Sequence, residues 1–113
     1  MFKKITVAVA KGDGIGGEIM NATLKILNAA KVPLNFNYVN MGKEFYLKGF
    51  STGMTPEAQT TVESTRILLK GPMETPKGTG VKSINVTARK VWSTFANKRV
   101  FQTLPGVETV FSK

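Results

Sequence analysis

The sequence contains neither cysteine nor histidine among its 113 residues. Without cysteine, the chain can form no disulfide bond and no thiolate metal site. Without histidine as well, it lacks Ser-His and Cys-His nucleophilic pairs and the usual zinc ligands. Any metal bound by this chain alone would need oxygen ligands, and the seven acidic residues are too scattered to suggest a Mg²⁺ or Mn²⁺ site.

Long apolar segments are missing too. The apolar run at residues 5–10 is far shorter than the ~20 residues that a membrane-spanning helix needs. A Gly-Asp-Gly turn follows this run where a secretory signal would carry small residues for cleavage. We therefore expect a cytoplasmic protein with no membrane partner.

Acidic residues are scarce, because sixteen Lys and Arg residues outnumber seven Asp and Glu residues and give a formal net charge of +9. This charge favours anionic ligands. The basic residues are spread along the chain without a basic arm or a recognition motif, so we expect no specific nucleic-acid partner. A small basic module that binds anions or nucleic acid without catalysis remains an alternative interpretation.

The spacing of apolar residues predicts an α/β protein made of one unit over residues 1–113. Residues 4–10 are typical of a strand, residues 17–31 have helical periodicity, and residues 34–38 alternate as in a half-buried strand. This order predicts a βαβ unit.

A second set of elements follows. Thr55 and Pro56 are suited to a helix start, and the helix should run to about Ser64. Residues 66–69 then predict a buried strand. Residues 70–82 are rich in Gly and Pro, which favours a structured loop of the kind that often binds ligands.

From Ser83 the sequence predicts another helix, on which Asn85 and Arg89 share one face, one turn apart. Its apolar stripe is Ile84, Ala88, Val91, Trp92 and Phe95. A further strand is expected at residues 99–103, and another apolar run follows at residues 107–111. Core roles are predicted for Met20, Trp92 and Phe95.

The first turn matches a dinucleotide-binding pattern, since residues 12–17 read Gly-Asp-Gly-Ile-Gly-Gly between a strand and a helix. That pattern also needs an acid about 20 residues later to hold the ribose. There is no Asp or Glu between Glu18 and Glu44. The simpler interpretation is a tight turn that starts a helix.

Three segments together resemble the β-decarboxylating dehydrogenases of the isocitrate/isopropylmalate dehydrogenase family: residues 5–20, 69–78 and 82–90. Ser83 and Asn85, which precede Arg89, resemble the isocitrate dehydrogenases in particular. The resemblance implies an incomplete sheet in αβα layers, not a true Rossmann fold, with the chain as the N-terminal portion of the large domain and the C-terminal remainder absent.

Site roles follow from the resemblance alone. It implies that the carboxylates of isocitrate are bound by Ser83, Asn85, Arg89 and Arg99, that Lys70 approaches the substrate, and that Pro72 and Thr75 lie near the nicotinamide. Hydroxyl and amide donors suit a third carboxylate, and arginine can bind a carboxylate at two points. Departures from the family pattern are Glu74 for a threonine, and Gly17 and Val100 for prolines.

The implied reaction is the oxidative decarboxylation of isocitrate to 2-oxoglutarate, with NAD or NADP and with Mg²⁺ or Mn²⁺. The resemblance implies that the metal ligands, the general acid and base and the adenosine contacts lie downstream of Lys113. We therefore expect no catalytic residue and no turnover in the isolated chain. The full-length form should be a homodimer, and self-association of the 113-residue chain is a hypothesis.

Overall fold

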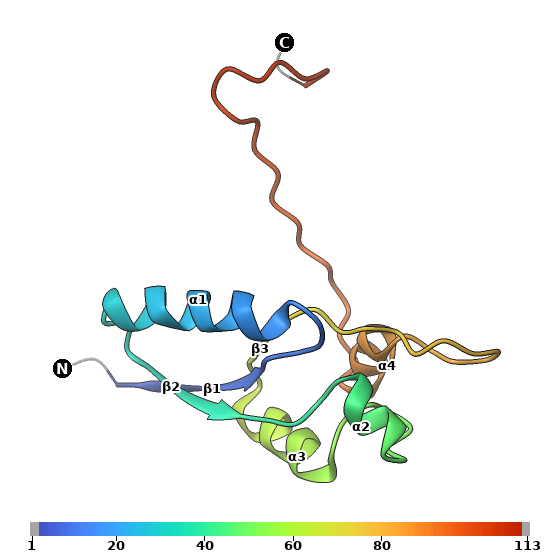
Figure 1. The fold of residues 1–113 in the computed structure, drawn as a ribbon. Coiled ribbons are helices and arrows are strands. Elements are labelled where there is room, and N and C mark those ends of the chain that lie inside the picture. Colours follow the sequence, from blue (N-terminus) through green and yellow to red (C-terminus); the bar gives the residue numbers. More distant parts are fainter. Residues whose placement is uncertain (1–2, 112–113) are drawn as a thin grey trace.

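A three-stranded parallel sheet forms the centre of the protein in a computed structural model that describes residues 3–111 (Figure 1). Strand β1 (Ile5–Ala10) lies between β2 (Leu34–Tyr38) and β3 (Leu68–Lys70). Val9 pairs with Tyr38 on one side and with Leu69 on the other. The strands therefore run in the same direction, and their carboxyl ends meet at one edge of the sheet.

Helix α1 (Gly16–Ala29) links β1 to β2 and covers one face of the sheet (Figure 1). Its buried side chains Met20 and Leu24 form a cluster with Val9, against which Phe36 and Leu69 pack. This arrangement confirms the predicted βαβ unit. Met20 is buried, as expected.

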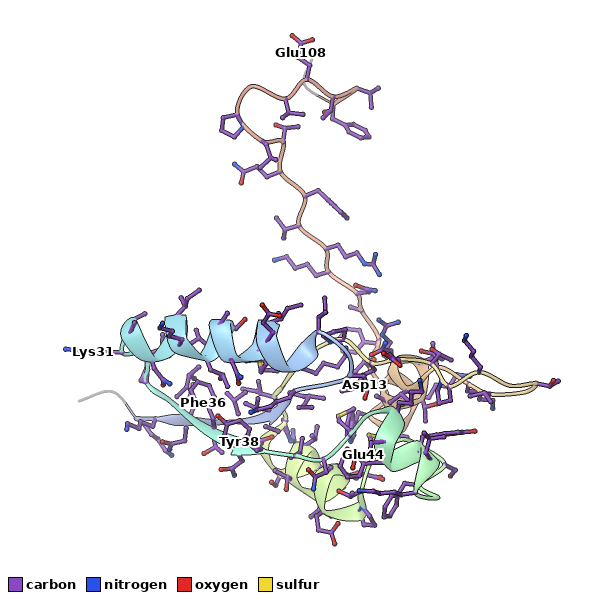
Figure 2. The ribbon with its side chains drawn as sticks, in the orientation of Figure 1. Asp13, Lys31, Phe36, Tyr38, Glu44 and Glu108 are labelled. Carbon is purple, nitrogen blue, oxygen red and sulfur yellow. The ribbon has the colours of Figure 1, made fainter. Side chains whose placement is uncertain are left out.

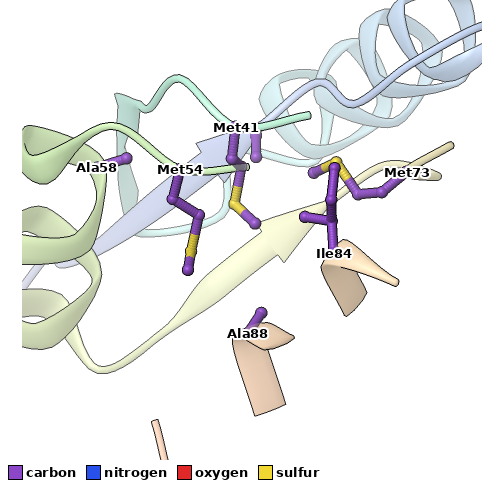
Figure 3. Close-up of a cluster of buried hydrophobic side chains, with 7 residues drawn as sticks. Met41, Met54, Ala58, Met73, Ile84 and Ala88 are labelled. Atoms are coloured by element: carbon purple, nitrogen blue, oxygen red, sulfur yellow. The ribbon is translucent and has the colours of Figure 1, made fainter. Parts of the chain in front are cut away.

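The opposite face carries the larger core, built by α3 (Pro56–Thr65), α4 (Ile84–Val91) and the loop between β3 and α4. The hydroxyl of Thr55 caps α3 by accepting a hydrogen bond from the N–H of Ala58 at 3.2 Å, as the sequence predicts for this residue type. The buried members of this core are Ala10, Met41, Met54, Ala58, Met73, Ile84 and Ala88 (Figure 3).

A short helix, α2 (Lys43–Leu47), was not predicted from the sequence. It lies beside α4 at the end of the sheet where the strands finish (Figure 1). Within residues 3–111, no helix has the length and apolar character required to cross a membrane.

Residues 93–111, here called the tail, extend away from the sheet and the helices, and Glu108 lies far from both (Figure 2). The strand predicted at residues 99–103 is not formed, and the core role predicted for Phe95 is wrong, because its side chain is 100% exposed. The reason is that α4 ends at Val91, so the predicted stripe stops at the half-buried Trp92. The chain then turns at Ser93, which has a positive φ of 49°.

Candidate functional site

The glycine-rich turn after β1 is a junction between two backbone segments. A Cβ atom at Gly12 would overlap the carbonyl oxygen of Pro72, and one at Gly71 would overlap that of Lys11. Gly12 also has a φ of +82°, and the N–H of Asp13 donates to the Pro72 carbonyl oxygen at 2.7 Å. The glycines at this turn therefore allow the loop after β3 to lie directly on the turn after β1.

The carboxylate of Asp13 ties this junction to α2. It accepts hydrogen bonds from the backbone N–H of Lys43 at 2.9 Å and from that of Glu74 at 2.9 Å. The Lys43 ammonium and the Glu74 carboxylate also form an ion pair at 2.9 Å, and this hydrogen bond and charge raise the pKa of Lys43. Because the chain's own loop fills the space beside the turn, the geometry supports a structural junction here.

A cavity of about 750 Å³ lies between α3, β3 and α4. Three of the five predicted substrate-binding residues line it: Lys70, Asn85 and Arg89. The shared lining confirms that Asn85 and Arg89, four residues apart, lie on the same face of one helix. The remaining lining residues are Val62, Glu63, Arg66, Leu68, Ala88, Val91, Trp92, Ser93 and Thr94.

The polar side of the cavity is rich in cations. Desolvation, and then the nearby Arg89 guanidinium, lower the pKa of Lys70. The Lys70 ammonium donates to the carbonyl oxygen of Gly71 at 2.9 Å, which holds it at the carboxyl end of β3. Two cations that destabilise each other in this way would both be stabilised by an anion placed between them.

Two polar atoms of the cavity lining are buried without a partner among the residues that the structure describes. They are the side-chain oxygen of Asn85 and the indole nitrogen of Trp92. Buried polar groups are nearly always hydrogen-bonded, so these two atoms are exceptions among the described residues.

The other predicted site residues lie elsewhere. Ser83 occupies the N-cap position of α4, but its side chain makes no capping hydrogen bond, and it does not line the cavity. Arg99 lies in the exposed tail, so the structure does not bring it to Asn85 and Arg89. Pro72 and Thr75 are exposed in the loop that Asp13 fixes.

Two charged lining residues, Glu63 and Arg66, were missed from the sequence. Arg66 follows α3 in the left-handed conformation, with φ 58°. Glycine is more usual at such a helix end, and a glycine in the sequence would have indicated it. Among residues 3–111, no three acidic side chains come together in a way that could hold a metal ion.

Comparison with known proteins gives a consistent result. The family model described as isocitrate/isopropylmalate dehydrogenase matches residues 6–112. The isocitrate dehydrogenase [NADP] of Thermus thermophilus is 43% identical over 106 residues, which are 94% of this chain and 21% of that protein. The mitochondrial isocitrate dehydrogenase [NAD] subunit 2 of Saccharomyces cerevisiae is 37% identical over 108 residues, 96% of this chain and 29% of that protein.

Solved structures are also similar to this chain. A protein from Thermus thermophilus aligns with a TM-score of 0.72 and 45% identity, over 76% of this chain and 17% of that one. The isocitrate dehydrogenase of Methylococcus capsulatus aligns with a TM-score of 0.67 and 32% identity, over 75% of this chain and 25% of that one. The chain thus spans less than a third of the length of each of these four relatives.

Proposed function

Because this chain belongs to the isocitrate/isopropylmalate dehydrogenase family, we propose that it is part of an NAD(P)-dependent isocitrate dehydrogenase and contributes to the isocitrate site. The proposed overall reaction is the oxidative decarboxylation of isocitrate to 2-oxoglutarate. Within it, the residues of this chain bind and orient the substrate.

The observation that carries this proposal is the meeting of Lys70, Asn85 and Arg89 at one cavity. A guanidinium binds a carboxylate through two parallel hydrogen bonds, an ammonium adds a point charge, and an amide nitrogen donates to a second carboxylate. This donor set suits a small polycarboxylate. An isopropyl group in place of the third carboxylate would leave the Asn85 donor unpaired, which disfavours isopropylmalate.

Ser83 and Arg99 complete the proposed substrate set. The Ser83 hydroxyl is not used for capping, so it can donate to a carboxylate at the start of α4. Arg99 joins the site only if the tail moves toward α4, because it lies in the extended tail in this structure. We therefore assign initial recognition to Lys70, Asn85 and Arg89.

Pro72 and Thr75 are the proposed contacts to the nicotinamide half of NAD or NADP, which would accept the hydride. The N–H of Glu74 donates to the Asp13 carboxylate, and the Glu74 side chain pairs with Lys43. These two contacts fix the loop between Pro72 and Thr75. The proposed Mg²⁺ or Mn²⁺ does not fit residues 3–111, which contain no suitable acidic cluster, so its ligands must come from elsewhere. We expect the purified 113-residue chain to produce no NAD(P)H from isocitrate.

Isothermal titration of the 113-residue chain with isocitrate tests the binding proposal. Arg89→Met should weaken binding about tenfold or more, because it removes charge-assisted hydrogen bonds of roughly 1.5–3 kcal/mol. Lys90→Met is the matched control, since it removes one positive charge from the same helix at a position that does not line the cavity. It should change the affinity less than about twofold.

Isopropylmalate and sulfate are titrated separately as comparison anions. Both should bind more weakly than isocitrate to the unaltered chain. Equal loss of isocitrate affinity in the two variants, or equal binding of sulfate and isocitrate, would show that net charge alone attracts the ligand and would contradict the proposed site.

A further inference from the structure

Asp13 does not line the cavity, yet its contacts reach the loop that directly follows Lys70. We propose that Asp13 is a positioning residue for the candidate substrate site and acts on the Lys70 ammonium through Pro72 and Gly71. The effect on binding rests on the proposed function, in which Lys70 contacts a carboxylate. The placement of Lys70 by Asp13 is a property of the chain itself and is measurable without a ligand.

The carboxylate of Asp13 joins segments that are distant in the sequence. Its Oδ2 atom accepts hydrogen bonds from the N–H of Lys43 and from the N–H of Glu74, both at 2.9 Å, and its Oδ1 atom accepts a longer one from Lys43 at 3.1 Å. The two donors lie 30 and 61 positions from Asp13. Hydrogen bonds to an ionised acceptor are roughly twice as strong as neutral ones. Asp13 therefore holds the start of α2 and the loop after β3 together.

The surroundings of this carboxylate leave it little room to shift. A Cβ atom at Gly42 would lie 2.6 Å from Oδ1 of Asp13, so the α2 backbone lies close against the carboxylate. The side chain of Glu74 is turned to the Lys43 ammonium at 2.9 Å. This ion pair is exposed and contributes little by itself, so we assign the main effect to the backbone N–H groups that Asp13 binds.

The path from Asp13 to the cavity runs through two peptide groups. The N–H of Asp13 donates to the carbonyl oxygen of Pro72 at 2.7 Å, and the N–H of Gly71 donates to that of Ala10 at 2.8 Å. The Gly71 carbonyl lies between these two anchors, and it accepts from the Lys70 ammonium at 2.9 Å. A lysine side chain is long and flexible, so a fixed acceptor reduces the entropy that it loses when a ligand binds.

Residue-resolved hydrogen exchange of the unaltered chain is the first test. Glu74 is exposed, so slow exchange of its N–H would come from the bond to Asp13. Asp13→Ala should speed this exchange about tenfold or more. Asp13→Asn should keep most of the protection, because an amide oxygen in place of Oδ2 has two lone pairs for the two 2.9 Å bonds. Rapid exchange of the Glu74 N–H in the unaltered chain would overturn the proposal.

The titration of Lys70, followed by nuclear magnetic resonance, is the second test. In the unaltered chain, desolvation and then Arg89 lower the pKa of Lys70. Asp13→Ala should return this pKa toward 10.5, because the released ammonium moves into solvent. The other charged residues that line the cavity, Glu63 and Arg66, are the same in both proteins.

Thr55→Ala is the matched control for a general loss of stability. It removes the cap of α3, a bond to the N–H of Ala58 at 3.2 Å, and does not touch the loop after β3. The pKa of Lys70 and the exchange of the Glu74 N–H relative to global unfolding should both stay as in the unaltered chain. Equal changes in Asp13→Ala and Thr55→Ala would show general loosening of the fold and would refute the positioning role.

Isothermal titration with isocitrate separates this role from the proposed function. Asp13→Ala should weaken binding about threefold or more, while Asp13→Asn and Thr55→Ala should stay within about twofold of the unaltered chain. No binding by the unaltered chain would contradict the proposed function, and the exchange and the Lys70 titration would still decide whether Asp13 places Lys70. Equal binding by the unaltered chain and Asp13→Ala would contradict the positioning role alone.

Discussion

Strand β1 and the tail both contain valines, yet the environments of these valines differ. Val7 and Val9 in β1 are 5% and 0% exposed, whereas Val100 in the tail is 82% exposed. β1 has a strand on each side and helices over both faces, and the tail has neither. The comparison shows that burial here depends on the surfaces an apolar segment meets more than on its own composition.

The largest expected difference between the two regions is the loss of stability when a glycine is replaced by alanine. Each region has a glycine with a similar backbone conformation. Gly12 has φ +82° and Gly106 in the tail has φ +77°, but only Gly12 has atoms within 4 Å of an added Cβ. Gly12→Ala should lower the free energy of unfolding by about 4 kcal/mol or more, because the Cβ would overlap the Pro72 backbone. Urea denaturation measures the change.

Gly106→Ala is the control, since it introduces the same conformational strain without the overlap. The exposed tail can relax around it, and we expect a change below about 1 kcal/mol. Similar losses in the two variants would show that positive φ, and not the contact with Pro72, makes Gly12 necessary.

A smaller effect is expected from truncating one large apolar side chain in each region. Ile84 is 2% exposed and lies in the larger core (Figure 3), while Phe101 is 85% exposed. Ile84→Ala should lower the free energy of unfolding by about 2–5 kcal/mol because it leaves a cavity. Phe101→Ala should change it by about 0.5 kcal/mol or less. Both measurements belong at concentrations where the chain is monomeric, and a large loss with Phe101→Ala would mean that the tail packs on its own chain.

Elements with strong local signals were predicted well from the sequence. The helix expected from Pro56 to about Ser64 is α3, Pro56–Thr65, because the Thr55 cap and Pro56 define its start. The helix expected at residues 17–31 is α1, Gly16–Ala29. Apolar spacing located these helices within two residues.

Elements that depend on distant contacts were missed or wrongly assigned. Helix α2 has five residues, and Asp13, thirty positions away, binds its first N–H. No local pattern could indicate that contact. The strand predicted at residues 99–103 has suitable residues but no partner strand in this structure, and strand propensity alone does not stabilise an isolated strand.

The candidate site was predicted only in part, because some of its residues are also brought together by distant contacts. The four-residue spacing of Asn85 and Arg89 was sufficient to place both on one surface, and Lys70 joins them at the end of β3. Helical spacing cannot show which residues from α3 complete the cavity, so Glu63 and Arg66 were not found. The substrate roles assigned to Ser83 and Arg99 stay predictions that depend on the resemblance.

The smallest expected effect concerns the charge of Lys70, whose folded pKa is lowered from its ordinary value of 10.5 by desolvation and by Arg89. Below this lowered pKa, Lys70 is protonated in both states and its charge destabilises the folded protein. The contribution of Lys70 to the free energy of unfolding therefore rises as pH increases from the lowered pKa to 10.5. In this window the unfolded chain binds more protons than the folded chain.

Lys70→Met removes this charge, so its stability advantage over the unaltered chain should be present at neutral pH and shrink across that window. The side chain is exposed, and solvent should keep the advantage smaller than the Ile84→Ala loss. Urea denaturation of both proteins across the pH range measures this advantage, and saturating isocitrate should reduce or reverse it at neutral pH by neutralising the cation pair. A constant difference at every pH would contradict the role of charge at Lys70 and remove one reason for an anion in the cavity.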